Sequence, residues 1–225
     1  AASYVSGVAV AASVDGTVLA LSSAEGVVAW RQTFEARFQH APLVGLRGDV
    51  PVVWLVSQAD GQIFCLRISD GTLVWKGEAT NRCDGTPIVS QGRLAYGNCD
   101  GAVYVFDAMD GALLGSVPVG ESDQMAGGLL ALAQGLLVTG TRSGNLAVVD
   151  TAARKLVAVA NVSASEAFVT PVMAWDGCVA MGASEGAVTF WRLERNALAA
   201  AGRVELGAPI DSLQSDGGRL YALTG

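Results

Sequence analysis

The chain has 225 residues, of which 51% are apolar and only 16% charged, and its formal net charge is −7. This length and composition suffice for a sizeable hydrophobic core and exclude a disordered chain. Lys and Arg total only 14 and form no cluster, which argues against nucleic acid or an acidic membrane surface as a partner.

Short apolar runs separated by turn residues follow one another from the N-terminus. Residues 1–15 carry two such runs, and the stretch 41–79 carries four, which read APLVG, VVWLVSQ, QIFCLRI and TLVWKGEA. Short runs rich in Val, Leu, Ile and aromatic residues predict β-strands. Asp60–Gly61 and Asp70–Gly71 lie between the runs and predict tight type I′ hairpin turns, in which both central residues have positive φ.

The unit of four runs recurs along the whole chain. The glycines of its first turn are spaced 40 to 45 residues apart, at Gly16, Gly61, Gly101, Gly144 and Gly186. Repetition at this period indicates one supersecondary unit stacked several times, as in a β-propeller. We therefore predict an all-β propeller of four-stranded antiparallel blades, with five full blades and half of a sixth in this chain.

Both ends of the sequence match the first two strands of a unit, at residues 1–15 and 208–225. A half blade leaves a strand edge exposed, and propellers avoid exposed edges by closing the ring. We therefore expect residues 1–225 to form a single propeller domain that is a segment of a longer chain with six to eight blades. Closure as five blades with a redundant hairpin, and completion by a partner chain, are the alternatives.

Three stretches share a detailed pattern: VDGTVLALSSAEGVVAW (14–30), ADGQIFCLRISDGTLVW (59–75) and CDGAVYVFDAMDGALLG (99–115). They resemble the PQQ-like repeat of quinoprotein-type β-propellers, whose pattern is DG-x-V-Y-A-L-D-x-x-x-G-x-x-x-W. The resemblance extends over essentially the whole chain and implies that Trp30 and Trp75 dock between neighbouring blades. Gly115 stands where the third repeat would have its Trp.

The resemblance does not extend to a catalytic site. Quinoprotein dehydrogenases use adjacent cysteines, a stacking Trp and a Glu/Asn/Asp set for calcium, and no such set stands out here. We therefore expect no quinone or other cofactor and no metal. A hydrolase site would depend on His40 alone, and a WD-repeat propeller would need a Gly-His pair in each unit. This segment is expected not to be an enzyme, and the sequence leaves open whether a catalytic domain is attached to it.

The four cysteines (Cys65, Cys83, Cys99 and Cys178) form no CxxC pair. They favour free thiols in a reducing compartment, and so the cytoplasm over the periplasm or envelope, which the sequence leaves open. Cys83 and Cys99 flank a predicted hairpin, so a bond between them also stays open. No membrane span is predicted, because the uncharged stretch 124–141 contains several Gly and follows the repeat.

The longer connections between predicted strands are the candidate binding region. They are residues 34–41, 80–85, 120–125 and 163–168, which a propeller brings to one face, and loops on a rigid scaffold commonly carry binding. Their aromatic residues and Met would serve as apolar anchors among charged residues. The predicted interaction face comprises Phe34, Arg37, Phe38, Arg82, Asp84, Glu121, Asp123, Met125, Glu166 and Phe168.

The function that these observations favour is a non-catalytic β-propeller scaffold that binds another protein or another domain of its own chain. Two alternatives follow from proteins that carry the same repeat. One is the C-terminal propeller module of an adenylate-forming, amino-acid-activating enzyme. The other is a bacterial envelope assembly factor.

Overall fold

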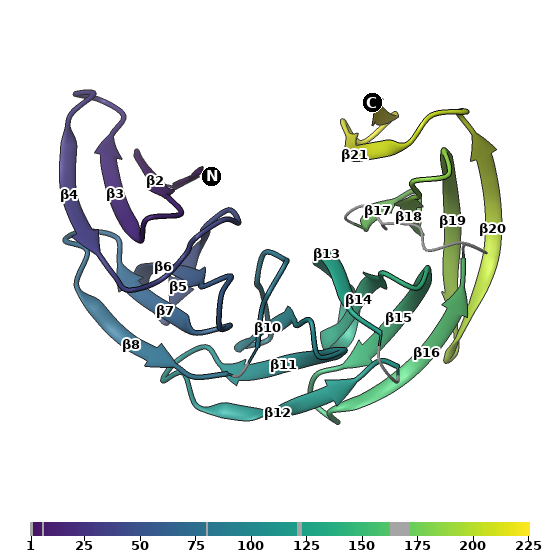
Figure 1. Ribbon diagram of the computed structural model, residues 1–225, viewed down its shortest axis with the longest axis horizontal. Coiled ribbons are helices and arrows are strands. Elements are labelled where there is room, and N and C mark those ends of the chain that lie inside the picture. Colours follow the sequence, from purple (N-terminus) through teal and green to yellow (C-terminus); the bar gives the residue numbers. More distant parts are fainter. Residues whose placement is uncertain (1, 6, 80, 121–122, 163–171) are drawn as a thin grey trace. The chain divides into compact units, whose positions relative to one another are not determined.

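The computed structural model describes residues 2–5, 7–79, 81–120, 123–162 and 172–225, with only the backbone of residues 126 and 127. Within these residues the fold consists of β-strands and one short 3-10 helix, η1 (Ala133–Gly135). The strands form five four-stranded sheets and one two-stranded sheet, and neighbouring strands in each sheet are consecutive in sequence (Figure 1). The prediction of an all-β fold built from four-stranded units is confirmed.

The first three sheets follow one another along the chain. The first sheet contains β1 (Ala2–Val5), β2 (Val8–Ala12), β3 (Thr17–Ser22) and β4 (Val28–Thr33). The second contains β5 (Leu43–Arg47), β6 (Val50–Val56), β7 (Ile63–Arg67) and β8 (Leu73–Gly77). The third contains β9 (Ile88–Ser90), β10 (Arg93–Gly97), β11 (Ala102–Asp107) and β12 (Leu113–Pro118).

The later sheets repeat this order. The fourth contains β13 (Met125–Ala131), β14 (Leu136–Thr141), β15 (Asn145–Asp150) and β16 (Lys155–Asn161). The fifth contains β17 (Met173–Trp175), β18 (Cys178–Gly182), β19 (Ala187–Glu194) and β20 (Ala197–Glu205). The two-stranded sheet is the antiparallel hairpin β21 (Ile210–Ser215) and β22 (Leu220–Thr224).

The chain divides into two compact units. The N-terminal unit comprises Ala1–Tyr96 and Tyr104–Gly115, and the C-terminal unit comprises Gly97–Val103 and Ser116–Gly225.

The hairpin turns use Asp and Gly differently from the type I′ prediction. Gly61 and Gly71 have positive φ (70° and 71°), whereas Asp60 and Asp70 are not among the residues that do. Instead, the carboxylate of Asp70 accepts a hydrogen bond from the backbone N–H of Thr72 at 2.9 Å. The Asp therefore closes the turn through its side chain, and only the Gly needs the left-handed conformation. The predicted positions of the turns are right and the predicted turn type is wrong.

One apolar cluster of the N-terminal unit lies between the first and second sheets. Val18 and Ala20 of β3 are fully buried, and they pack in one cluster with Phe64 and Leu66 of β7. Burial alternates along β3, because only one face of the first sheet is covered. By contrast, all of β7 except its last residue is buried, which shows that the second sheet is covered on both faces.

The C-terminal unit has two apolar clusters. One joins Val138, Leu146 and Val148 of the fourth sheet to Val179 and Met181 of the fifth. The other joins Ala180 and Val188 of the fifth sheet to Ile210 and Leu213 of the terminal hairpin. Each sheet of this unit thus uses its apolar face to pack against the next one.

Candidate functional site

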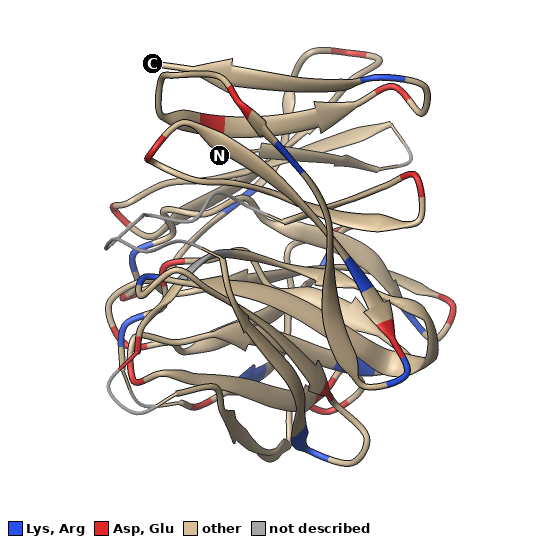
Figure 2. Ribbon diagram, turned by 90° about the vertical axis from the view of Figure 1, so that its right-hand side faces the viewer, with Lys and Arg blue, Asp and Glu red and all other residues tan. Residues whose placement is uncertain are grey.

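The carboxylates of the turn Asp residues accept hydrogen bonds from the backbone of their own turns. Asp15, Asp60 and Asp100 each accept a hydrogen bond from the N–H two residues further on, at 2.9, 3.2 and 3.2 Å. A hydrogen bond from the Ser13 hydroxyl and bonds from Thr17 lower the pKa of Asp15 below its ordinary value. These carboxylates therefore stabilise turns, and many charged residues lie at turns and strand ends (Figure 2).

The aromatic residues of the connection 34–41 belong to the core. Phe38 is 1% exposed, and Phe34 is half-buried. Both rings contact Phe64 of β7, with ring centroids 5.0 Å (Phe34) and 5.5 Å (Phe38) away. The expectation that Phe38 offers an apolar anchor to a partner is therefore corrected, because its ring fills the space between the first two sheets.

Gln58, in the turn that follows β6, links two of the predicted binding loops in the N-terminal unit. Its backbone N–H donates to the carbonyl of Arg37 at 2.7 Å, and its carbonyl accepts from the N–H of Cys83 at 3.0 Å. Its side-chain amide donates to the carboxylate of Asp84 at 3.0 Å. Arg82 forms an ion pair with the same carboxylate at 2.9 Å. We call Arg37, His40, Gln58, Arg82 and Asp84 the Gln58 cluster.

His40 belongs to the Gln58 cluster because the charge of Asp84 acts on its imidazole. Burial lowers the pKa of His40 below its ordinary value, while the carboxylate of Asp84 and a backbone hydrogen bond with Cys83 act in the opposite direction. Its Nε2 atom is buried and has no hydrogen-bond partner among the described residues. His40 is therefore neutral at physiological pH. Arg37 and Arg82 are the exposed cations of the cluster.

Sequence reasoning missed Gln58. It is the terminal polar residue of the apolar run VVWLVSQ, two residues before Asp60 of the Asp60–Gly61 turn. A polar residue at the end of an apolar run suggests a contact with a loop. The sequence does not show which loop, because the hydrogen-bond partners of Gln58 are 21 or more residues away along the chain.

The predicted residues of the C-terminal unit are largely buried. Asp123 is 4% exposed and Met125 2%. The Asp123 carboxylate accepts from the Ser143 N–H at 3.0 Å and from the Asn145 amide at 3.1 Å. Burial raises the pKa of Asp123, but hydrogen bonds from Thr141, Ser143 and Asn145 outweigh it and hold the pKa below its ordinary value.

Asp123 thus fastens its loop to the fourth sheet, whereas Met125 is the first residue of β13, and neither is exposed enough to contact a partner directly. The remaining predicted residues of this region, Glu121, Glu166 and Phe168, lie outside the described residues.

Trp30 and Trp75 lie against glycines of the following sheet. A Cβ atom on Gly71 would lie 2.6 Å from the Trp30 ring, and one on Gly111 would lie 2.4 Å from the Trp75 ring. The Trp30 indole N–H also donates to the carbonyl of Ile68 at 2.6 Å. Both side chains are 8% exposed. This geometry fits the docking role that the repeat implies for them.

Other features of the described residues bear on chemistry. No disulfide bond joins any two of the four cysteines, all of which lie in the described ranges. No three His, Cys, Asp or Glu side chains in the described ranges gather as they would around a metal ion. In the same ranges, none of the helical structure has the length and apolarity of a membrane span.

Comparison with known proteins identifies relatives of this arrangement. A family model described as outer membrane protein assembly factor BamB matches residues 14–222. BamB of Taylorella asinigenitalis (strain MCE3) is 31% identical over 96 residues, which are 42% of this chain and 25% of that protein. The aligned region thus spans a quarter of the length of this relative.

Solved structures show the same fold. The computationally designed Ika8 protein superimposes with a TM-score of 0.83 at 16% identity, over 98% of this chain and 66% of that one. BamB from Moraxella catarrhalis superimposes with a TM-score of 0.67 at 19% identity, over 96% of this chain and 78% of that one. The C-terminal WD40 domain of Sif2 superimposes with a TM-score of 0.80 at 12% identity, over 98% of this chain and 65% of that one. At these identities the likeness shows the β-propeller fold alone.

The repeat in the sequence and the four-stranded sheets of the structure agree with the family match, which covers nearly the whole chain. The chain belongs to the PQQ-like repeat β-propeller family described as outer membrane protein assembly factor BamB.

Proposed function

We propose that the chain is a non-catalytic β-propeller scaffold that binds other proteins during outer membrane protein assembly in a bacterial envelope. The family match over residues 14–222 is the observation that carries this proposal. The relatives from Taylorella asinigenitalis and Moraxella catarrhalis both bear the name BamB, and the former is described as an assembly factor. These names support the envelope alternative and offer nothing for the module of an adenylate-forming enzyme.

The proposal also changes the expected compartment. Free thiols had favoured the cytoplasm, whereas a role in outer membrane protein assembly belongs to the envelope. Buried thiols are compatible with either, because Cys65 and Cys83 are both fully buried and shielded from oxidants by the fold.

The Gln58 cluster is the proposed contact surface of the N-terminal unit. Hydrogen bonds fix the backbone of both loops to the second sheet, so little conformational entropy would be lost on binding. Arg82 remains 56% exposed although it pairs with Asp84. Exposed arginines on a rigid frame are frequent energetic centres of protein interfaces, and they favour an acidic partner surface here.

The test is affinity capture from the solubilised envelope of Taylorella asinigenitalis, with captured proteins identified by mass spectrometry. We expect the chain to retain outer-membrane assembly proteins and the variant R37E/R82E to lose them. The control R154E/R195E makes the same charge change at two exposed turn residues of the C-terminal unit and should capture normally. Circular dichroism verifies that both variants are folded.

Equal capture by R37E/R82E and by the unmodified chain would rule out the Gln58 cluster as the contact. Failure of the unmodified, folded chain to retain any outer-membrane assembly protein would rule out the assembly function itself.

A further inference from the structure

The chain contains a single histidine, His40, and it lies inside the Gln58 cluster. The ordinary pKa of histidine, 6.5, lies close to neutral pH, so its side chain is the one that commonly changes charge in mild acid. Any effect of mild acid that involves an imidazole therefore acts through this residue. The contacts of His40 determine what that effect is.

His40 links the segment 34–41, on which it lies, to the segment 81–85. Its imidazole makes a hydrogen bond with the backbone of Cys83. This bond raises the pKa of His40, so the imidazole is the donor and the Cys83 carbonyl accepts. Because Nε2 has no hydrogen-bond partner among the described residues, the donor is Nδ1. His40 thus joins the same two loops that Gln58 joins.

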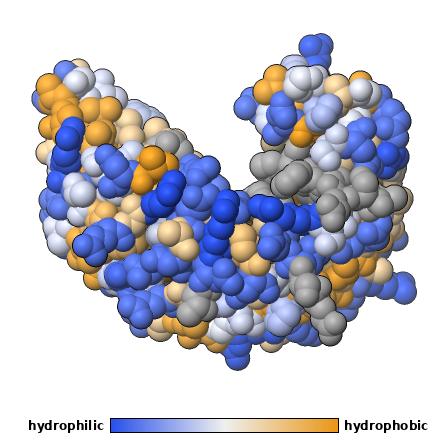
Figure 3. All heavy atoms as spheres, in the orientation of Figure 1, coloured by the Kyte–Doolittle hydropathy of each residue, from blue (hydrophilic) through white to orange (hydrophobic). Residues whose placement is uncertain are grey.

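Protonation of His40 would place a positive charge at a buried atom. Hydrophilic residues are widespread on the face that Figure 3 shows, where water can solvate a charge. The Nε2 atom of His40 is buried instead. A proton on Nε2 would be a buried donor without an acceptor, and burial also penalises the charge itself. The arrangement in which both loops are attached therefore favours the neutral imidazole.

The charged groups around the ring do not cancel this penalty. The Asp84 carboxylate favours the imidazolium, but it already pairs with Arg82 at 2.9 Å, and the charge of Arg82 disfavours the imidazolium. These two groups face the ring from the segment 81–85. Glu35 and Arg37, on the same segment as His40, are both exposed and have opposite charges. The net effect is a lowered pKa of His40, with burial as the largest cause.

The segment 81–85 is held in a strained conformation. Asn81 has a φ of 107°, beyond the left-handed region that Asn adopts at low cost. Its side chain accepts a hydrogen bond from the Arg82 N–H at 2.9 Å, and the Cys83 N–H donates to the Gln58 carbonyl at 3.0 Å. Strained backbone persists only where surrounding contacts hold it. The contact with His40 is one of those that keep this segment in place.

Mild acid therefore favours release of the segment 81–85. In the released form water reaches the ring and its pKa returns to the ordinary 6.5, whereas in the attached form the pKa is lower. The released form binds the proton more tightly, so protons shift the equilibrium toward it. The stability of the attached form is complete above pH 6.5 and decreases as the pH falls from there to the attached-state pKa.

We propose that His40 is a pH-sensitive latch of the Gln58 cluster: mild acid protonates its ring, releases the segment 81–85 and weakens the binding of a partner. Arg82 and Asp84 lie on this segment, so its release displaces one of the two exposed arginines of the contact surface. The effect on partner binding rests on the proposed function of the cluster. The release itself does not.

The thiol of Cys83 reports the release without any partner. It is fully buried, and its Sγ donates to the Gly85 carbonyl at 3.4 Å. The assay is timed labelling with dipyridyl disulfide near pH 8 and near pH 5, followed by peptide mapping. The protection factor is the labelling rate in the urea-unfolded chain divided by that in the folded chain at the same pH. This ratio removes the intrinsic reactivity of the thiol.

The Cys83 protection factor should be about threefold to thirtyfold lower near pH 5 than near pH 8. The upper limit is the full effect of an imidazole whose pKa in the released form is 6.5.

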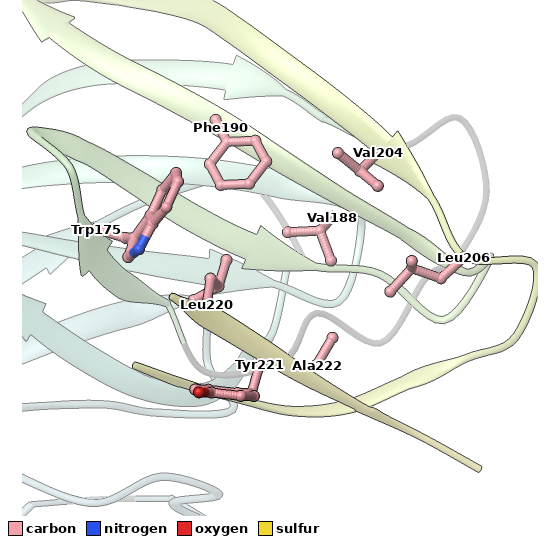
Figure 4. Close-up of a pocket in the computed structure, with 8 residues that line it drawn as sticks. All are labelled: Trp175, Val188, Phe190, Val204, Leu206, Leu220, Tyr221 and Ala222. Carbon is pink, nitrogen blue, oxygen red and sulfur yellow. The ribbon is translucent and has the colours of Figure 1, made fainter. Parts of the chain in front are cut away.

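Two other thiols control for unfolding of a whole unit. Cys65 of β7 is fully buried in the second sheet. Cys178 of β18 belongs to the fifth sheet. Between that sheet and β22 lies an apolar groove of about 490 Å³, and none of its lining residues is charged (Figure 4). Mild acid should leave such packing unchanged, so the protection factors of both thiols should be the same at the two pH values.

The variant His40→Asn separates the latch from other effects of acid. The Asn amide can donate to the Cys83 carbonyl from the place of Nδ1, but it does not titrate. The Cys83 protection factor of this variant should therefore not depend on pH. In the unmodified chain, the one histidine gives unambiguous long-range proton–nitrogen NMR signals. These should show the proton on Nδ1 at neutral pH and a His40 pKa below 6.5.

Affinity capture at the same two pH values tests the effect on binding. The unmodified chain should retain at least about threefold less of its partner near pH 5. His40→Asn should retain equal amounts at both pH values.

Three results would overturn the latch: a His40 pKa at or above 6.5, a Cys83 protection factor that does not change with pH, or the same change in folded His40→Asn. Capture that stays constant while the Cys83 protection factor falls would overturn its control of binding. A folded chain that captures nothing at either pH would refute the proposed function instead, and the labelling of Cys83 would still decide the latch.

Discussion

Replacing Gly71 by Ala tests how the first sheet docks on the second. Gly71 has a φ of +71°, and an added Cβ would lie 2.6 Å from Cε3 and 2.7 Å from Cδ2 of Trp30. The ring cannot easily move aside, because its N–H donates to the Ile68 carbonyl at 2.6 Å and only 8% of the side chain is exposed. Gly71→Ala must therefore displace either the ring or the turn.

The expected cost has two parts. An Ala in the left-handed conformation costs about 1 kcal/mol. Overlap with a packed ring adds about 1–3 kcal/mol. Gly71→Ala should thus lower the free energy of unfolding by about 2–4 kcal/mol. Gly26 is a matched control, since its φ is +68° and an added Cβ would meet nothing within 4 Å. Gly26→Ala should lower the free energy of unfolding only by the cost of the left-handed backbone, about 1 kcal/mol.

A double-mutant cycle with Trp30→Ala isolates the contact. Trp30→Ala alone should cost about 3–5 kcal/mol, because it leaves a cavity and an unpaired Ile68 carbonyl. In that background Gly71→Ala should cost only about 1 kcal/mol, since the ring it would strike is gone. The assay is urea unfolding followed by circular dichroism. Equal costs for Gly71→Ala and Gly26→Ala, or a cost of Gly71→Ala that Trp30→Ala leaves unchanged, would refute the docking argument.

Three further predictions concern single side chains. Asp123→Asn should lower the free energy of unfolding at neutral pH by about 1.5–3 kcal/mol, because a charged acceptor of several hydrogen bonds is lost. The Asp123 pKa in the folded protein lies below its ordinary 3.8, so this stabilisation is complete above that pH and disappears as the pH falls through the folded-state pKa. Tyr96→Phe should cost about 1 kcal/mol, because the Tyr96 hydroxyl donates to the buried carbonyl of Gly61. Burial raises the pKa of the Cys65 thiol to about 12, despite the opposing charge of Arg47, so Cys65 should resist a thiol reagent at mildly alkaline pH until the protein unfolds.

Urea unfolding at several pH values measures the stability of Asp123→Asn and Tyr96→Phe. Peptide mapping after timed labelling measures how fast Cys65 reacts. A difference between Asp123→Asn and the unmodified chain that stays constant down to acidic pH would contradict the role of the carboxylate. Unchanged stability of Tyr96→Phe would show that its hydroxyl contributes nothing. Cys65 should react more slowly than the half-buried Cys178, and equal rates would contradict the burial argument.

The candidate site separates what local pattern can and cannot predict. Arg37 and Arg82 lie in polar connections, and the structure leaves both exposed, as such composition leads one to expect. Phe38 and Met125 lie in the same connections, yet they are buried. Composition shows that a loop contains an apolar residue, but it does not show whether a neighbouring sheet has a gap for that residue to fill.

The sequence by itself determined the strands, their four-membered grouping and the positions of the turns. These features depend on short-range rules: apolar runs form strands, and Asp with Gly closes the connection between them. The repeat period and the Trp positions then identified the family. Only the tertiary structure decided that Gln58 joins two loops, that Asp123 is buried and that a groove lies beside β22. Each of these depends on groups from separate segments of the chain that meet in space, and the distances between those groups are fixed by tertiary packing rather than by any one segment.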